Sequence, residues 1–222
     1  YRRYGFLFRE HFSALRAVGA PAEMDAGRLC EIGCRDEVIE VTGNMKFDGA
    51  FSNLDRKLDV AALLQRLGAV KDAPVLVGGS THDGEERLLA QMFPRLKEHC
   101  PALMLVIVPR HFERAQLVGE QLRALGQRFV FRSQLTDESD ADCLVVDSTG
   151  ELTLFYEAAN IDFVGKSLTA CGGLNHIEPA SLGCAVVFCP EMQNFRAVVR
   201  SFLEEGAATQ ATDAAELENV VA

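Results

Sequence analysis

Glycines and one arginine lie where the chain could hold a phosphate group. Gly78, Gly79 and Gly84 flank the polar run 80–83, and glycine lets main-chain N–H groups approach an anion closely. Arg110 follows an apolar run, and its planar guanidinium suits forked hydrogen bonding to a phosphate or a carboxylate. These residue types predict an anion site built from main-chain amides and one cation.

Two further loops have the same character. The sequences Thr149-Gly150-Glu151 and Gly172-Gly173 place N–H groups at expected helix starts, where an anion is favoured. Three histidines, His82, His111 and His176, are spread over three loops and lack the spacing of metal ligands. We therefore expect no metal ion and no other cofactor.

Ordinary helix-start chemistry explains some of the same residues. Asp83 with Glu86, and Asn175 with Glu178, have the spacing of a capping box. A glycine-rich turn taken alone is also more often a plain turn than a phosphate site. Arg110 is harder to explain by structure alone, because a cation at the ligand edge of an acidic protein needs a partner.

The segments that position these loops alternate between apolar runs and amphipathic periodicity. Strands are predicted at residues 74–78, 103–108, 129–131, 143–146, 163–165 and 185–188, and helices at 88–96, 117–125, 151–159, 177–182 and 195–204. This alternation predicts the α/β class with a Rossmann-like, doubly wound parallel sheet. Ligands of such sheets bind beyond the carboxyl ends of the strands, so the loops at 79–85, 109–111, 147–151 and 171–176 should converge.

The composition limits the classes of partner. Of the 222 residues, 22 are basic and 32 acidic, and the resulting net charge of −10 argues against nucleic-acid binding. The longest apolar runs, 103–108 and 184–189, are far shorter than the ~20 residues that a membrane-spanning helix needs. None of the seven cysteines forms a C-x-x-C pair, so we expect a reducing cytoplasm and thiols that pack as small hydrophobic groups.

The residues before 74 are expected to belong partly to another domain. A helix is predicted near 22–30 and a strand near 38–42, and the first residue is Tyr1 rather than Met. We interpret residues 1–40 as the remnant of a preceding domain of a longer protein, and residues 41–222 as the main domain. The cations and aromatic rings of residues 1–9 suit either an anionic membrane surface or a helix docked on missing sequence.

Eight short motifs occur in an order typical of one enzyme family. The chain resembles the carboxyl-terminal half of the 3-deoxy-D-manno-octulosonic acid (Kdo) transferases of lipopolysaccharide synthesis. The resemblance extends from about residue 15 to about residue 205, and its motifs are Thr42 to Asp48, Gly79 to Glu86, Val108 to His111, Asp147 to Leu152, Phe163 to Leu168, Gly172 to Asn175, Glu178 to Ala180 and Met192 to Phe195.

The resemblance implies a GT-B glycosyltransferase, in which two Rossmann-like domains face a cleft. Members transfer Kdo from CMP-Kdo to a lipid A precursor, with inversion, at the cytoplasmic face of the bacterial inner membrane. Residues 41–222 would form the donor-binding domain, which would act with an amino-terminal domain that also meets the membrane surface. The family's general base is a glutamate of that other domain, so this chain alone should bind the donor and not catalyse.

The resemblance also assigns roles to residues of this chain. Lys46 matches a family lysine that stabilises the transition state, as a cation beside a departing phosphate would. The CMP of the donor would be held at four loops by Ser80, Thr81, Pro109, Arg110, Thr149, Gly150, Glu151, Asn175, His176, Ile177 and Glu178.

Three positions depart from the family pattern, and two other functions fit the same features. Leu174 replaces a usual His or Gln, and Cys189 with Glu191 replaces parts of a usual Gly-Pro-His.

Among the alternative functions, a GT-B enzyme that uses a UDP-sugar is the first. A nucleotide-binding module without catalysis is the second.

Overall fold

The computed structural model describes residues 5–43, 58–137 and 139–222. The chain divides into two compact units, Tyr1–Asn53 and Leu54–Ala222, which we describe separately. Among the described residues, every helix is too short or too polar to cross a membrane.

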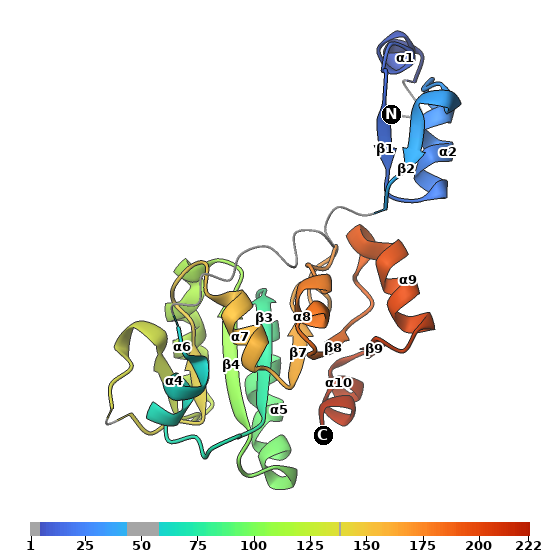
Figure 1. Cartoon of the computed structure of the whole chain (residues 1–222). Coiled ribbons are helices and arrows are strands. Elements are labelled where there is room, and N and C mark those ends of the chain that lie inside the picture. The colour runs from blue at the N-terminus through green and yellow to red at the C-terminus, as the bar shows by residue number, and fades with distance from the viewer. Residues whose placement is uncertain (1–4, 44–57, 138) are drawn as a thin grey trace. The chain divides into compact units, whose positions relative to one another are not determined.

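The smaller unit contains a parallel pair of strands joined through a helix (Figure 1). Its elements are α1 (Gly5–Ser13), β1 (Val18–Ala20), α2 (Glu23–Glu31), a 3-10 helix (Asp36–Val38) and β2 (Ile39–Val41). In the β1–β2 pair, Val18 lies opposite Ile39. The predicted helix near 22–30 and strand near 38–42 are confirmed. A helix was one of the two alternatives for residues 1–9, where α1 begins, whereas β1 was not predicted.

The larger unit is built on a seven-stranded sheet in which every pair of neighbours is parallel. The strand order is β5-β6-β4-β3-β7-β8-β9. The strands are β3 (Val75–Thr81), β4 (Met104–Pro109), β5 (Phe129–Phe131), β6 (Cys143–Val145), β7 (Ile161–Val164), β8 (Ala185–Phe188) and β9 (Ala208–Gln210). The predicted doubly wound parallel sheet is confirmed.

Helices connect these strands and cover the sheet (Figure 1). They are α4 (Val60–Arg66), α5 (Glu85–His99), α6 (Ala115–Ala124), α7 (Leu152–Ala158), α8 (Ile177–Ser181), α9 (Arg196–Glu204) and α10 (Ala214–Val221), with 3-10 helices at Phe112–Arg114, Arg132–Gln134 and Gln193–Phe195. The elements α4, β9 and α10 were not predicted. The sequence of β9, Ala-Thr-Gln, has no apolar run, and only its pairing with β8 makes it a strand.

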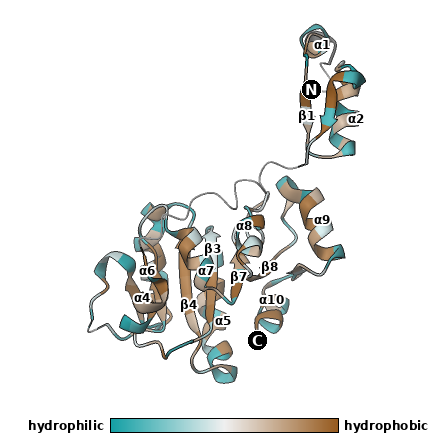
Figure 2. Ribbon diagram, viewed as in Figure 1, coloured by the Kyte–Doolittle hydropathy of each residue, from teal (hydrophilic) through white to brown (hydrophobic). Residues whose placement is uncertain are grey.

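The core has two layers because successive strand residues point to opposite faces of the sheet. Leu105 and Ile107 of β4 pack with α5 and α6 on one face. Met104, Val106 and Val108 pack with α4 and α7 on the other. Hydrophobic colour runs along β4 and β7 in Figure 2, whereas the helices also carry polar residues. The central strands therefore form a buried and rigid platform for the loops at their ends.

Candidate functional site

The strand order reverses between β3 and β7, at the centre of the sheet. From β3 the chain builds β4, β6 and β5 on one side, and from β7 it builds β8 and β9 on the other. Ligands of open parallel sheets bind outside the carboxyl ends of the strands at such a point. The loops after Thr81, Pro109 and Val164, which end β3, β4 and β7, therefore form the centre of the candidate site.

Main-chain hydrogen bonds join these strand ends. The N–H of Arg110 donates to the carbonyl of Thr81 at 3.0 Å, and the N–H of Gly165 donates to the carbonyl of Gly79 at 2.9 Å. The structure thus brings together the predicted loops at Ser80–Thr81 and Pro109–Arg110 with the start of the segment after β7, in which the loop at 171–176 was also predicted.

Two residues at these strand ends have a left-handed backbone. The φ angle is +53° at Ser80 and +61° at Lys166, and such values are uncommon for residues with a Cβ. The ends also touch, because a Cβ built on Gly165 would lie 2.3 Å from the carbonyl oxygen of Ser80. Strained backbone of this kind gathers at functional sites, which supports a binding role for this edge.

Glu85 fixes the loop after β7 against the loop after β3. Its carboxylate is fully buried and accepts four main-chain N–H groups. The donors are His82 and Lys166, both at 2.8 Å, and Ser167 and Leu168, both at 3.1 Å. These amides are therefore occupied by a carboxylate of the protein and cannot also bind a ligand's phosphate.

The predicted capping box of Asp83 and Glu86 is wrong by one residue. Helix α5 begins at Glu85, after Gly84 with φ +89°, and no side chain caps it. The bond from a helix residue back to the preceding turn does exist, but it runs from the N–H of His82 to Glu85.

Glu86 instead joins the first turn of α5 to the segment after β4. The buried Glu86 carboxylate accepts from the Thr81 hydroxyl at 3.0 Å and from the Arg114 guanidinium at 2.7 Å. Arg114 also pairs with Asp83 at 2.9 Å. Burial raises the pKa of the Glu86 carboxyl, although Arg114 opposes this shift. The Thr81 hydroxyl and Arg114 are thus committed to internal contacts.

Arg110 is placed differently from Arg114. Its side chain is exposed at the end of β4, and it forms no ion pair with any described residue. The ring of His111 contacts that of His82 edge to face, with centroids 6.3 Å apart. Pro109 and Ser80 are buried. The exposed Arg110 side chain is thus a cation that a ligand at this edge can reach.

The loop before α7 follows the next strand of the sheet. The Val146 N–H donates to the Ile107 carbonyl at 2.9 Å, which aligns the end of β6 with β4. Thr149 and Gly150 are exposed, whereas Glu151 is half-buried. The Glu151 carboxylate accepts from the Ser148 hydroxyl and pairs with Arg132 at 3.3 Å. Glu151 therefore also orders its own loop.

Residues 175–178 form the start of α8, and part of the predicted capping box is present. The Asn175 side chain accepts from the N–H of Ile177 at 3.3 Å. Glu178 does not reach back to Asn175; its carboxylate accepts from the Thr153 hydroxyl of α7. This bond joins the two helices that follow β6 and β7.

The side chains of His176 and Ile177 are buried, with 0% and 1% exposure. The His176 ring lies 5.0–5.5 Å from the rings of Phe188, Phe195 and Phe202. Contact of either residue with a ligand would have to come from the main chain. Sequence reasoning did not separate these buried side chains from the exposed ones around them.

The three departures from the family pattern have clear surroundings. Leu174 packs against the small core around β8, and the Cys189 thiol is fully buried. The Glu191 carboxylate accepts from the Gln193 amide and lies beside the Cys171 thiol, and both contacts lower the pKa of Glu191.

The cysteines of the described residues are all free. Cys143, Cys184 and Cys189 are buried as expected, and burial raises the pKa of Cys184 and Cys189 to about 12. Cys171 is exposed, which contradicts the expectation that every cysteine packs inside. Within the described ranges no group of His, Cys, Asp and Glu is arranged to hold a metal ion. Lys46 lies outside the described residues.

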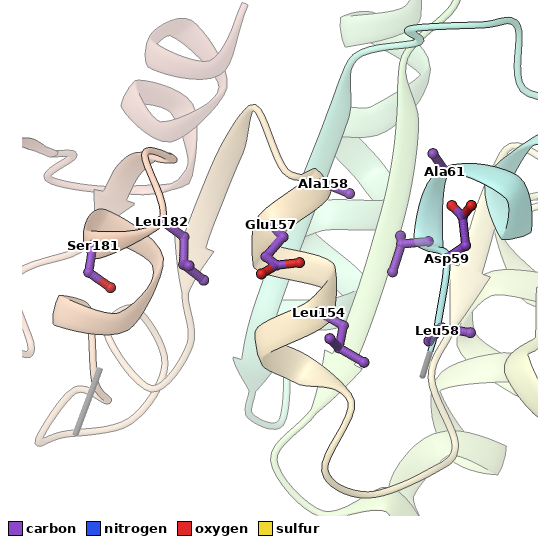
Figure 3. Close-up of a pocket in the computed structure, with 9 residues that line it drawn as sticks. Leu58, Asp59, Ala61, Leu154, Glu157, Ala158, Ser181 and Leu182 are labelled. Atoms are coloured by element: carbon purple, nitrogen blue, oxygen red, sulfur yellow. The ribbon is translucent and has the colours of Figure 1, made fainter. Parts of the chain in front are cut away.

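The largest hollow of this unit that we describe lies between helices α4, α7 and α8 (Figure 3). It encloses about 880 Å³ between the start of α4, the outer side of α7 and the end of α8. Asp59 and Glu157 contribute carboxylates, and the described lining residues include no cation. An anionic nucleotide would be repelled there, so this hollow is not the candidate site.

Comparisons with known proteins agree on one family. A family model described as 3-deoxy-D-manno-octulosonic-acid transferase (kdotransferase) matches residues 1–49. The 3-deoxy-D-manno-octulosonic acid transferase of Bordetella pertussis is 31% identical over 215 residues, which cover 95% of this chain and 49% of that protein. The transferase of the same name from Haemophilus influenzae is 31% identical over 208 residues, with 91% and 48% covered. The chain spans about half the length of these curated relatives.

Solved structures give the same fold. The C-terminal CMP-Kdo binding domain of WaaA from Acinetobacter baumannii superposes with a TM-score of 0.64 at 29% identity, and 80% of this chain and 88% of that domain are covered. The UDP-GlcNAc 2-epimerase of Neisseria meningitidis, solved with UDP-GlcNAc, has a TM-score of 0.57 at 13% identity, with 92% and 51% covered. At that identity, the second likeness concerns the fold alone.

Proposed function

The chain belongs to the Kdo transferase family, and we propose that its larger unit binds the donor CMP-Kdo for transfer of Kdo. The observation that carries the proposal is the likeness to the Acinetobacter baumannii domain, which is described as CMP-Kdo binding. The likeness covers 80% of the chain. At the carboxyl edge of the sheet, Arg110 is exposed and forms no ion pair among the described residues.

The donor's nucleotide lies along the carboxyl edge of the sheet in this proposal. Arg110 pairs with its phosphate, and a guanidinium is suited to that geometry. Thr149 and Gly150 supply exposed polar groups one strand further along. Glu151, Glu178 and the main chain at 175–177 shape the remaining wall, while Ser80, Thr81 and Pro109 form its floor.

The chemical step needs residues beyond the described ones. Lys46 stabilises the negative charge that develops on the leaving phosphate, and the base that activates the acceptor comes from the amino-terminal domain of the longer protein. We propose a lipid A precursor as acceptor, inversion at the transferred sugar, and work at the cytoplasmic face of the inner membrane. No metal ion takes part in this scheme.

A calorimetric titration of the 222-residue chain with CMP, UMP and UDP tests the proposal. Binding of CMP with clear preference over UMP and UDP is expected. A preference for UDP would point to an enzyme of the same fold that uses UDP-sugars. Absence of CMP binding would contradict a donor site complete within this chain. In the longer protein, Lys46→Ala should lower turnover more than donor affinity.

A further inference from the structure

Lys166 holds a backbone conformation that glycine would adopt more easily. Its φ of +61° is left-handed, which is costly for a residue with a Cβ. Two hydrogen bonds keep it there: its N–H donates to Glu85 at 2.8 Å, and its carbonyl accepts from the Gly173 N–H at 2.9 Å. The stem runs beside Gly172, because a Cβ built there would lie 3.8 Å from Cε of Lys166. The fold thus holds a strained lysine in a defined place.

That place is the reversal point of the strand order. Lys166 is the second residue after β7, and the Gly165 N–H before it donates to Gly79 of β3. Ser80, the other left-handed residue of this edge, lies against Gly165. The lysine is therefore positioned where a ligand of this sheet would lie.

The charges of this edge leave Lys166 and Arg110 available. Arg114 is paired with Glu86 and Asp83, and Arg132 is paired with Glu151. Lys166 is half-buried and forms no ion pair within the described ranges. The neighbouring Glu191 has its hydrogen bonds with Gln193 and Cys171 instead.

We propose that Lys166 is a second donor-binding cation, which pairs with an anionic group of the sugar nucleotide. This inference rests on the proposed function above. CMP-Kdo carries two negative groups, the phosphodiester and the carboxylate of the sugar acid, and Arg110 can pair with only one of them. In a chain of net charge −10, a second anion needs a second local cation. An ammonium on a flexible stem meets either group without demanding forked geometry.

The test compares Lys166→Gly and Lys166→Arg with the unchanged chain. Glycine fits the left-handed backbone and removes only the cation, so the variant should melt no lower than the unchanged chain. Its dissociation constant for CMP-Kdo should rise about tenfold, as for loss of a charge-assisted hydrogen bond, and arginine should restore most of the affinity. Asp72→Gly is the matched control, since Asp72 is left-handed with φ +58° in an exposed turn before β3, at the opposite sheet edge.

Titration with CMP identifies the anionic group. An equal loss of CMP affinity in Lys166→Gly would assign the ammonium to the phosphate, and unchanged CMP affinity would assign it to the sugar carboxylate. A CMP-Kdo affinity within about twofold of the unchanged chain would overturn the inference, since a charge-assisted bond is worth more than that. If the unchanged chain binds neither CMP nor CMP-Kdo, the proposed function itself fails. If the unchanged chain binds both ligands and Lys166→Gly binds them with the same affinity, this inference alone fails.

Discussion

The Glu85 carboxylate accepts a hydrogen bond of 2.8 Å from the main-chain N–H of Lys166, 81 residues further along the chain. The bond joins the loop after β3 to the loop after β7 at the point where the strand order reverses. With the N–H groups of His82, Ser167 and Leu168, the carboxylate has four donors. Glu85 thus acts as an internal anion that gives both loops one fixed arrangement.

Glu85→Gln should destabilise the chain, because an amide has one acceptor oxygen and its NH₂ group would face N–H donors. We expect the free energy of unfolding to fall by about 2–4 kcal/mol, the cost of leaving buried polar groups unpaired. Urea denaturation measures this loss. Glu98→Gln, at an exposed position of the same helix, is the control and should change stability by less than about 0.5 kcal/mol. A similarly small loss for Glu85→Gln would show that the four bonds contribute little.

Gly79 is predicted to tolerate no side chain. A Cβ built there would lie 2.4 Å from the Tyr156 hydroxyl and 2.7 Å from Oδ1 of Asp162. Gly79→Ala should therefore cost about 2 kcal/mol or more in stability. Adding Tyr156→Phe removes the closest atom, so the double variant should lose less than the sum of the single losses, by about 1 kcal/mol. Strict additivity in urea denaturation would mean that the backbone moves away from the tyrosine instead. Gly27→Ala, in helix α2 of the smaller unit and with open space around its Cβ, should not lower stability, because alanine is favoured over glycine in a helix.

The sheet was readable from the sequence because its strands are continuous apolar runs bounded by turn residues. The bounds of Phe129–Phe131 and Ala185–Phe188 agree with the predicted ranges. The edge strand β9 was missed because three residues without an apolar run become a strand only through their partner β8. Local pattern therefore predicted the sheet from β5 to β8, whereas the edge strand β9 depends on tertiary pairing.

The candidate site was predictable in position but not in its internal contacts. Parallel topology places every loop that follows a strand at one edge, so Arg110 and Thr81 could be expected to meet. The partners of Glu85 and Glu86 lie on distant segments, and no local spacing reveals that Arg114 is neutralised by Glu86 while Arg110 stays unpaired among the described residues. The available signal was the pair of consecutive acids Glu85 and Glu86 at the start of an amphipathic helix. The capping box predicted for Asp83 and Glu86 lies one residue away from the bond that forms, between the His82 N–H and Glu85.

Arg110→Ala should weaken CMP binding by about 1.5–3 kcal/mol, because a charge-assisted bond to the phosphate is lost. The exposed side chain has no ion pair to break within the described residues, so the melting temperature should not change. Arg123→Ala is the matched control, since it removes the same charge near the far end of α6, where Arg123 lies over the Phe129 ring. Calorimetry of both variants measures the effect, and equal CMP affinity in the two would remove Arg110 from the site.

Asp162→Asn should stabilise the protein increasingly as the pH rises. Burial raises the pKa of the Asp162 carboxyl well above its ordinary 3.8, Glu178 adds to the shift, and the Gly79 N–H opposes it. Between the ordinary and the raised value, the folded state keeps a proton that the unfolded state releases, so stability is lost as the pH rises through this window. Asparagine is neutral throughout, keeps the shape and has no such loss.

Urea denaturation at several pH values between about 4 and 8 measures the difference between Asp162→Asn and the unchanged chain. The gap should be smallest at the acid end, where the pH is closest to the ordinary pKa of 3.8 and the unfolded chain still keeps part of the proton, and should widen toward neutral pH. Glu86 also has a raised pKa, but it is present in both proteins and cancels from the comparison. Asp72→Asn, at an exposed turn, should show no widening gap. A constant gap for Asp162→Asn would mean that Asp162 ionises in the folded protein as it does in the unfolded chain, and that a partner compensates its burial.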